Sequence, residues 1–549
     1  MIDDNSKEFI ARHIGPSQED QEKMLQAVGA KSLDDLMKNT VPEKILLSKK
    51  LNVSEPISEN DALKKLKSIS KKNEIFRNFI GMGYYNTFTP NVILRNILEN
   101  PGWYTSYTPY QPEVAQGRLE MLLNFQQVIT DLTGMDIANA SLLDESTAAA
   151  EAVGLSQRID KNNSIHVFVS SDCNPQTIDL IKTRTEPFGL KLLIGNQKDF
   201  LSNINDKLVC GVLPYPGTLG DIVDPSEAIS QIHKKGGKAI VIADLLSLTK
   251  LKTPAELGAD IAVGSAQRFG IPMGYGGPHA AFFATKEEFK RSMPGRIIGV
   301  SVDRYGKKAY RLSLQTREQH IRRDKATSNI CTAQALLAII SAAYAIYHGP
   351  KGILKIAERT SKLAKLFYEG IKSAGFEILS DQFFDTVTIK TKDKTKEIYE
   401  KALAKKINLR NVNNEMISVA FDEAKKLDDV NMLLEIFGLN KKYDQNINIE
   451  LSNIPSQLKR TSKYLTHPVF NKYQSETEML RYLKKLEDCD IALNRSMIAL
   501  GSCTMKLNAT AELIPITWKE FSLPHPFVPV EQMKGYQVLF NDLINDLKE

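Results

Sequence analysis

The feature that most constrains this chain is an internal repeat with a very long period. Residues 475–483 match residues 58–66 at an offset of 417, and the offset stays close to that value downstream. The later matches pair the only two tryptophans of the chain with each other, together with prolines and glycines: Gly83 with Gly501, Trp103 with Trp518, Pro109 with Pro526, Pro112 with Pro529, and Gly117 with Gly535. Solenoid repeats have periods of roughly 20–50 residues. The period therefore indicates a duplicated whole unit, and we expect the second copy to stop at Glu549, before most of its fold.

Chance similarity between helices rich in Lys, Leu and Glu is the alternative explanation of the repeat. Shared Trp, Pro and Gly at a nearly constant offset argue against it. A chain of 549 residues is also too long for one domain of about 100–200 residues. Length and repeat together favour a multidomain chain.

Composition excludes several classes of protein. The chain is 42% apolar and 25% charged, as soluble globular proteins are. No apolar run approaches the roughly 18 residues of a membrane span, and the acidic first residues resemble neither a signal nor a transit peptide. The net charge of +6 fits lysine-rich helix faces better than a concentrated basic stripe. We expect a cytoplasmic protein without membrane or nucleic-acid binding.

The cysteines and histidines predict neither a disulfide framework nor a metal site. Five cysteines are scattered through the sequence without a C-x-x-C pair, at positions 173, 210, 331, 489 and 503. Such cysteines are typical of reduced thiols. Eight dispersed histidines show no metal-ligand spacing.

From Arg118 onward, helical patterns alternate with short apolar runs. We predict helices at 118–133, 146–158, 176–184 and 226–234, and strands at 165–169, 190–194, 208–213, 239–243, 260–263 and 280–284. Buried β-rich runs between amphipathic helices predict a doubly wound parallel sheet covered on both faces. A helical stretch over 326–375 follows, and then a smaller α/β section with strands at 387–389 and 417–419.

These patterns predict five parts of the chain. They are a helical N-terminal arm over 1–80, a large α/β domain over 81–345, a small α/β domain over 346–440, a polar linker over 441–457, and the truncated start of a second unit over 458–549. Residues 81–117 are rich in Gly, Pro and aromatic side chains. Such an irregular stretch is expected to cover or recognise something.

One pair of positions has the layout of a fold-type-I pyridoxal phosphate (PLP) enzyme. In that layout a strand-end Asp faces the pyridinium nitrogen and keeps the ring protonated, while a Lys after a later strand forms the Schiff base. Asp244 ends the apolar run 240–243, but Gln267 stands at the lysine position after the run 261–263. An amide nitrogen is not a nucleophile. We therefore predict that this unit has no catalytic residue and that Asp244 is vestigial.

Six longer motifs resemble the P-protein family of the glycine cleavage system, the decarboxylating glycine dehydrogenases. They are residues 9–15, 81–87, 107–113, 265–279, 316–332 and 501–508. The resemblance implies two homologous units of the fold-type-I PLP class. The first has lost the lysine, and the second carries it in a His-Lys-Thr-Phe segment that matches residues 266–269 here. This chain would hold the whole first unit and only the opening of the second.

The resemblance also implies a reaction and partners. Glycine is decarboxylated with PLP, CO₂ is released, and the aminomethyl group passes to the lipoyl group of the H protein. PLP would be held covalently only by the missing lysine-bearing unit. The partners implied are the lipoylated H protein, that second unit and glycine, in a dimer or heterotetramer. The chain by itself would be inactive.

Further candidate residues come from the matched motifs. Ser502, Cys503, Thr504 and Lys506 would bind PLP phosphate or substrate in the second unit, because hydroxyls and lysine suit an anion; the alternative is an ordinary polar loop. Cys503 is either redox-sensitive or an inert buried thiol. The candidates for a substrate or lipoyl channel, or for simple interface packing, are Tyr107, Tyr110 and Glu113.

Two other segments have open interpretations. Residues 141–147 open a helix whose N-terminus would cradle phosphate in a working unit, or only cap the helix in this one. The basic residues of the fifth motif either meet a partner, a phosphate or an acidic lipoyl protein, or form a solvated helix face. They are Arg317, His320, Arg322, Arg323 and Lys325.

Two other functions compete with the decarboxylase component. One is a non-catalytic scaffold that stabilises a PLP partner and docks the lipoyl carrier. The other is an independent enzyme of the aminotransferase type, which Gln267 disfavours. The decarboxylase component and the scaffold differ in whether the rest of the second unit exists in the cell on the same chain.

Overall fold

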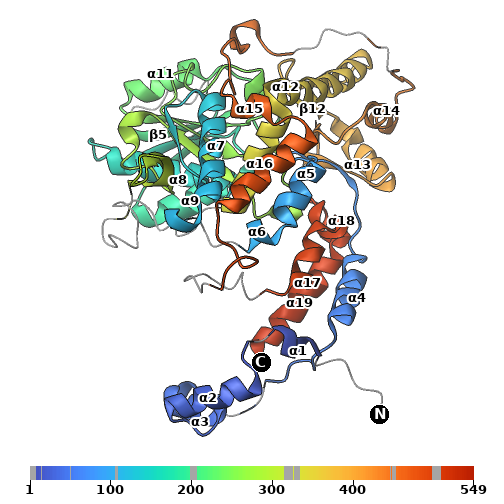
Figure 1. The fold of residues 1–549 in the computed structure, drawn as a ribbon. Helices are drawn as coiled ribbons and strands as arrows, with labels where there is room; N and C mark the ends of the chain where they lie inside the picture. The colour runs from blue at the N-terminus through green and yellow to red at the C-terminus, as the bar shows by residue number, and fades with distance from the viewer. Residues whose placement is uncertain are drawn as a thin grey trace. The chain divides into compact units, whose positions relative to one another are not determined.

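The computed structural model describes residues 8–13, 15–47, 49, 51–105, 109, 111–197, 207–314, 326, 330, 334–444, 447, 453–497 and 508–549 (Figure 1). The chain divides into two compact units. The helical unit comprises Met1–Ile75, Leu507–Ser522 and Val528–Glu549, and the sheet unit comprises Phe76–Lys506 and Leu523–Phe527. Both copies of the repeat contribute to each unit. Within the described ranges, no helix has the length and apolar character needed to cross a membrane.

The sheet unit is built on a seven-stranded sheet of order β2-β8-β7-β6-β5-β3-β4. Its strands are β2 (Ile137–Ala138), β3 (His166–Ser170), β4 (Lys191–Gly195), β5 (Leu208–Tyr215), β6 (Lys238–Ala243), β7 (Ile261–Ser265) and β8 (Ala281–Thr285). The six strands predicted here are confirmed. Neighbouring strands from β4 to β7 are parallel, whereas β8 is antiparallel to both of its neighbours, β7 and β2. β8 returns from β7 without a crossover helix, which a parallel neighbour would normally require.

Helices cover both faces of this sheet, as a doubly wound fold requires. They are α7 (Gln116–Thr133), α8 (Glu145–Ile159), α9 (Pro175–Thr185), α11 (Ser226–Lys234) and α12 (Ala335–Ser373). Alternate side chains of β6 show the two faces. Val241 packs in the core that contains α7, α11 and α12, while Ile240 and Ile242 pack in the core that contains α8. The side chains of β6 are thus buried on both faces of the sheet, which fixes the position of its carboxyl end.

The helix α12 joins this sheet to a second, five-stranded one of order β1-β13-β14-β12-β11. Gly349, with φ 61° and ψ 176°, and Pro350 interrupt the helix. Its buried residues up to Ala357 pack in the core beside the seven-stranded sheet, and those from Leu363 onward pack in the core of the five-stranded sheet. The prediction of helix from residue 326 is too long at its start, because the described residues 326, 330 and 334 are not helical. The strands are β1 (Arg77–Phe79), β11 (Glu377–Ile378), β12 (Thr386–Lys390), β13 (Ile407–Asn413) and β14 (Met416–Ala420).

Several remaining elements were not predicted as such. They are α5 (Asn91–Ile93), α6 (Pro101–Tyr104), β9 (Ile297–Val302), β10 (Lys308–Ser313), α13 (Thr395–Ala404), α14 (Leu427–Ile436), α15 (Val469–Lys472) and α16 (Glu476–Asp488). β1 pairs in parallel with β13, 330 residues further along the chain. A three-residue strand with so distant a partner has no periodicity that a sequence window could detect.

The two copies of the repeat exchange helices. In the sheet unit, α16 from the second copy packs against α7 from the first. In the helical unit, α4 (Glu59–Ser70) from the first copy packs against α19 (Lys534–Lys548) from the second. Figure 1 shows each pair as a blue helix beside an orange or red one. The other helices of the helical unit are α1 (Glu8–His13), α2 (Gln18–Val28), α3 (Leu33–Thr40), α17 (Thr510–Leu513) and α18 (Lys519–Ser522).

Candidate functional site

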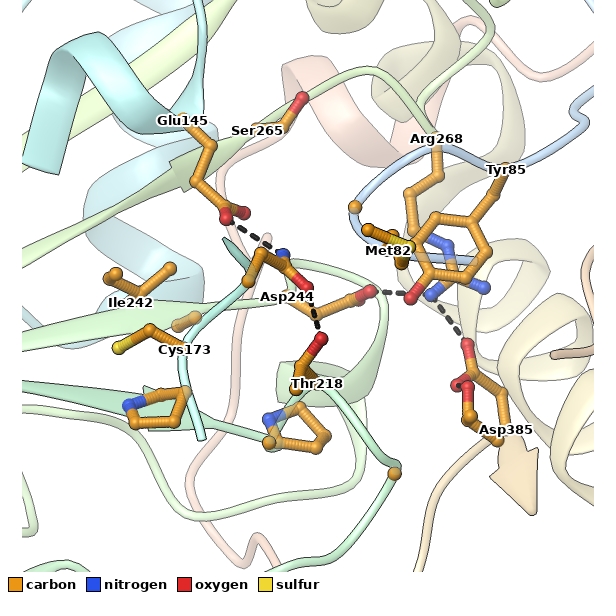
Figure 2. Close-up of a pocket in the computed structure, with 18 residues that line it drawn as sticks. Met82, Tyr85, Glu145, Cys173, Thr218, Ile242, Asp244, Ser265, Arg268 and Asp385 are labelled. Atoms are coloured by element: carbon orange, nitrogen blue, oxygen red, sulfur yellow. Dashed lines mark hydrogen bonds and ion pairs between the residues drawn. The ribbon is translucent and has the colours of Figure 1, made fainter. Parts of the chain in front are cut away.

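A small cavity lies at the carboxyl ends of β5, β6 and β7, where doubly wound folds bind ligands (Figure 2). It encloses about 60 Å³. Its walls come from strand ends of the seven-stranded sheet, from the segment just before β12, from the start of α8, and from residues 82–85. The polar and charged lining residues include Glu145, Asn174, Thr218, Asp244, Arg268 and Asp385.

Gln267, at the position where a lysine would be expected, is fully buried and hydrogen-bonded on both sides of its amide. Its Nε2 donates to the carbonyl oxygens of Tyr85 (2.7 Å) and Ile271 (2.6 Å), and its Oε1 accepts from the N–H of Tyr85 (2.9 Å). A lysine is a donor only and cannot accept the last bond. This side chain therefore serves to hold the backbone of Tyr85 in place.

The next residue, Arg268, is the centre of a buried ion cluster. Its Nη1 lies 2.5 Å from Oδ2 of Asp244 and 2.7 Å from Oδ2 of Asp385. Its guanidinium carbon lies 3.8 Å from the centre of the Tyr85 ring. Burial would by itself lower the pKa of Arg268, but the two carboxylates raise it further than burial lowers it. The arginine is therefore permanently charged.

The two carboxylates of this cluster differ in their environment. Asp244, directly after β6, accepts the N–H groups of Leu246 and Ser247 on Oδ1, at 2.8 and 2.9 Å. Asp385 is more deeply buried, and burial raises its pKa to about 6 against the opposing charge of Arg268. One cation cannot balance two buried carboxylates. The cluster therefore has no positive charge left to balance a further anion.

The helix α8 begins at the cavity with carboxylates in its first turn. Oδ1 of Asp144 accepts the N–H of Thr147 at 2.7 Å and caps the helix. Glu145 accepts from the amide of Asn174 (3.0 Å) and from the hydroxyl of Thr177 (3.2 Å), and burial raises its pKa. Of the two interpretations of residues 141–147, the structure supports the cap. Acidic side chains already occupy the place that favours a phosphate.

The residues of this cavity do not fit PLP. The lysine position holds an amide that is fully hydrogen-bonded, the strand-end Asp244 already faces a guanidinium, and the helix N-terminus carries carboxylates. One of the three groups that would hold the cofactor is thus replaced, and the other two are already occupied by groups that compete with it or oppose it. We derive no chemical step through PLP in this unit.

A segment of the second copy, Leu523–Phe527, docks beside the cavity. Nε2–H of His525 donates to the carbonyl of Gly81 (2.9 Å), and its Nδ1 accepts the N–H of Phe527 (3.1 Å). Burial lowers the pKa of His525 to about 4, so the ring is neutral. The ring of Tyr84 lies 5.7 Å from that of His525. The irregular stretch from residue 81 thus lines the cavity and receives the second copy.

The glycine-rich loop after β7 contacts the same segment. The N–H of Tyr275 donates to the carbonyl of Pro524 at 2.9 Å. Gly276 has φ 117°, a conformation that favours glycine, and a Cβ there would lie 3.5 Å from Pro526. The positive φ values of Gly274, Gly276 and Gly277 allow the chain to turn tightly in this loop.

The structure brings only part of the predicted site together. Asp244 and Gln267 line or flank the cavity, whereas Glu113 is exposed on the turn Pro112–Val114. The remaining predicted residues lie outside the described ranges. They are Tyr107, Tyr110, Ser502, Cys503, Thr504 and Lys506, and in the basic segment Arg317, His320, Arg322, Arg323 and Lys325.

Sequence reasoning missed the roles of Arg268, Tyr85 and Asp385. For Arg268 a signal existed, because it directly follows Gln267 and a strand-end Asp without a cofactor needs another cation. Asp385 gave none, because 117 residues separate it from Arg268.

Comparison with known proteins gives a consistent result. The family model described as "Glycine cleavage system P-protein" matches residues 11–437. A glycine dehydrogenase (decarboxylating) of Pelagibacter ubique is 70% identical over 548 residues, and one of Vibrio parahaemolyticus is 53% identical over 547. These matches cover 100% and 99% of this chain but 57% of each relative. The chain therefore spans little more than half the length of these curated relatives.

A solved structure matches about three quarters of the chain. It is a crystal structure of a glycine decarboxylase (P-protein) of the glycine cleavage system in inhibitor-bound form. The match has a TM-score of 0.72 at 33% identity, and it covers 77% of this chain and 98% of that one.

Proposed function

This chain belongs to the P-protein family of the glycine cleavage system, and we propose that it provides the lysine-free half of a glycine decarboxylase. The complete enzyme would decarboxylate glycine with PLP, release CO₂, and pass the aminomethyl group to the lipoyl group of the H protein. PLP would supply the electron sink for this reaction in a second unit. The role of the present chain would be to hold, cover and complete that second site.

The observation that carries this proposal is the hydrogen bonding of Gln267. Both ends of its amide bind backbone groups in a buried site, so it is part of the fold and offers no amine. The nucleophile that PLP chemistry requires must then come from elsewhere. Family membership and the internal repeat point to the second copy.

The exchange of helices supports the proposal that the two copies of the repeat are built together. The outer face of α19 exposes Phe540, Leu543, Ile544 and Leu547, between 47% and 77% of each side chain. The repeat equates these positions with Leu122, Phe125, Gln126 and Ile129 of α7, which are all buried beside the seven-stranded sheet. A second sheet, equivalent to the one in this chain, would cover the α19 face in the same way.

The same repeat suggests which first-copy residues reach the second site. At an offset of 417, Tyr107 corresponds to Pro524 and Tyr110 to Phe527. In the described structure, the segment with Pro524 and Phe527 lies beside the cavity of the first copy. We propose that Tyr107 and Tyr110, with Glu113 on the adjacent turn, lie in the same way beside the second site, in its substrate or lipoyl channel.

The second copy contributes its own candidates. Ser502, Cys503 and Thr504 correspond at an offset of 418 to Tyr84, Tyr85 and Asn86, and Tyr85 lines the cavity. We propose that these three residues and Lys506 line the second site and bind PLP or substrate. Small hydroxyl and thiol side chains leave space there, and Lys506 adds a cation that suits a phosphate.

The test is the exchange of labelled bicarbonate into glycine in the presence of lipoylated H protein and PLP. We expect no exchange from this chain alone, and exchange when a complete lysine-bearing unit is supplied. A chain with Asp490→Ala, which loses the buried ion pair between Asp490, just after α16, and Arg118 of α7, should reconstitute poorly, whereas Arg304→Ala on an exposed turn should behave as the wild type. Exchange by this chain alone would contradict the proposal.

A scaffold function is the second candidate, and the occupied cavity favours it as well. A scaffold would bind the lysine-bearing unit and raise its stability without changing its turnover. A decarboxylase half would raise turnover when the second unit is already saturated with PLP. The same reconstitution, followed by both thermal unfolding and exchange, separates the two.

A further inference from the structure

We infer that the sheet unit carries a built-in substitute for a cofactor: the stacked pair of Tyr85 and Arg268 fills the cavity at the strand ends and locks the two sheets together. This inference rests on the geometry of the cavity. It holds whether or not the complete enzyme decarboxylates glycine.

The pair reproduces the two properties of a protonated pyridine ring in this place. Arg268 supplies the cation that faces Asp244, at 2.5 Å. Tyr85 supplies a flat aromatic ring, stacked 3.8 Å from the guanidinium carbon. In Figure 2 the Tyr85 ring lies against Arg268, between Asp244 and Asp385. The carboxylate of Asp244, which would otherwise have no cation beside it, thus has a permanent partner in Arg268.

The lock joins parts of the fold that are distant in sequence. Asp244 and Arg268 follow β6 and β7 of the seven-stranded sheet, while Asp385 immediately precedes β12 of the five-stranded sheet. The same Nη1 atom binds both carboxylates. Moving one sheet away from the other would separate a buried cation from a buried carboxylate, which is strongly unfavourable.

Neighbouring contacts strengthen this connection. The hydroxyl of Thr388 on β12 donates to the carbonyl of Leu219 at 2.7 Å, and Nη1 of Arg410 on β13 donates to the hydroxyl of Thr218 at 3.0 Å. A Cβ at Gly220 would lie 2.2 Å from the carbonyl oxygen of Thr386. The two sheets are therefore in close backbone contact beside the ion cluster.

The space that remains is small, and several of the polar side chains that line it are already bonded to one another. The hydroxyl of Thr218 donates to Asn174 at 2.7 Å, and Asn174 donates to Glu145 at 3.0 Å. At about 10–15 Å³ for each water, a cavity of about 60 Å³ holds only a few waters. A phosphorylated pyridine would have to displace Tyr85.

The internal repeat offers an independent argument. The second copy has Cys503 at the position of Tyr85, by the same offset of 418 that relates Gly83 to Gly501. A thiol in place of a phenol removes the ring that fills the cavity here. The bulky residue is therefore a property of the lysine-free copy and is not required by the fold.

The first test compares Arg268→Ala with Arg304→Ala. Arg304 also lies over a tyrosine ring, that of Tyr305 at 4.5 Å, but on an exposed turn. We expect Arg268→Ala to lower the thermal midpoint of the sheet unit by several degrees, and Arg304→Ala to leave it unchanged. Guanidinium chloride at low millimolar concentration should restore most of the loss in Arg268→Ala only. A wild-type midpoint for Arg268→Ala, or a loss that guanidinium does not reduce, would overturn the lock.

Asp385→Asn keeps the shape of the site and provides a second variant should Arg268→Ala not fold. We expect faster hydrogen exchange in β12 and unchanged exchange in β6, because only the link to the five-stranded sheet is weakened. Equal rates in wild type and variant would contradict the lock.

The occupancy is tested with pyridoxine 5′-phosphate, which has no aldehyde and cannot label surface lysines. Calorimetric titration of the wild-type chain should show no saturable binding. Saturable one-to-one binding that Asp244→Asn abolishes would show that the cavity is open, and would overturn the inference.

Discussion

The two helix pairs formed between the copies can be compared residue by residue. In the sheet unit, a Cβ at Gly117 would lie 1.9 Å from the carbonyl oxygen of Leu486; in the helical unit, a Cβ at Gly535 would lie 2.5 Å from that of Ile69. The repeat equates Gly117 with Gly535 and Leu486 with Ile69. Both pairs therefore use a glycine so that one helix can approach the end of the other.

The polar contact at this crossing has the same backbone geometry but different side chains. Asp490 accepts the N–H groups of Gly117 (2.7 Å) and Arg118 (3.1 Å), and its counterpart Asn73 accepts the N–H of Tyr536 (3.2 Å). Only the first pair adds a buried ion pair, with Nε of Arg118 2.6 Å from Oδ2 of Asp490. The duplication thus preserved the backbone contact while the side chains diverged.

The outer faces of the two pairs differ most. Phe125 of α7 is completely buried, whereas its counterpart Leu543 of α19 is 56% exposed. One helix lies against a sheet of its own copy, and the other has no such cover among the described residues. The contact between α4 and α19 therefore forms although the outer face of α19 is exposed. Each tryptophan can report on one pair, because Trp103 belongs to the sheet unit and Trp518 to the helical unit.

Truncating a side chain on the outer face of each helix pair should give the largest difference in stability. Phe125→Ala should destabilise the sheet unit by about 4 kcal/mol, because it leaves a cavity in a closed core. Leu543→Ala should change the helical unit by less than about 0.5 kcal/mol, because the side chain is already exposed. Urea unfolding followed by the fluorescence of Trp103 or Trp518, each in a variant that lacks the other, measures both. Equal losses would show that the two faces are covered alike.

The next largest difference in stability should come from the polar contacts made by Asp490 and by its counterpart Asn73. Asp490→Ala should cost about 3 kcal/mol, because it leaves the buried Arg118 without its carboxylate. Asn73→Ala should cost about 1 kcal/mol, because it removes hydrogen bonds but no charge. The same unfolding assay applies. A cost for Asn73→Ala as large as that for Asp490→Ala would contradict the assigned role of the ion pair.

Lowering the pH tests the contribution of His525, in the segment Leu523–Phe527, to the stability of the sheet unit. The unfolded chain protonates His525 near pH 6.5, whereas burial and the nearby Lys425 lower its folded pKa to about 4. Stability should therefore fall as pH decreases from about 6.5 to about 4, by roughly 2–3 kcal/mol in total. The urea midpoint reported by Trp103 should decrease over this range in the wild type and much less in His525→Gln. The same decrease in both proteins would exclude His525 as its cause.

The smallest effect concerns lysines on the exchanged helices. Lys67 pairs with Glu520 at 2.8 Å and lies 4.5 Å from the Trp518 ring, and its counterpart Lys484 pairs with Asp488 at 3.0 Å. The pair of Lys484 is exposed and that of Lys67 is only partly buried, so each lysine-to-alanine change should cost about 0.5 kcal/mol. Lys67→Ala should also shift the emission of Trp518. No shift would mean that the lysine does not lie over the ring.

Much of the sheet unit could be predicted from the sequence, because apolar runs and helical periodicity are local signals. Those apolar runs placed Asp244 and Gln267 after the ends of two strands. The sequence itself then showed a glutamine at the position where a lysine would be expected. The antiparallel turn into β8, the strand β1 and the role of Asp385 depend on distant partners, which no window of sequence shows. The repeat was visible as an offset, but the exchange of helices is a three-dimensional property that the offset alone does not define.

We predict that this copy performs no cofactor chemistry and that a second, lysine-bearing unit would supply it. Borohydride reduction in the presence of PLP, followed by peptide mapping, tests it most directly. We predict no stoichiometric pyridoxyl label on any lysine of this chain, and one label per assembly, on the second unit, when that unit is supplied. A stoichiometric label on a single lysine of this chain would contradict the account.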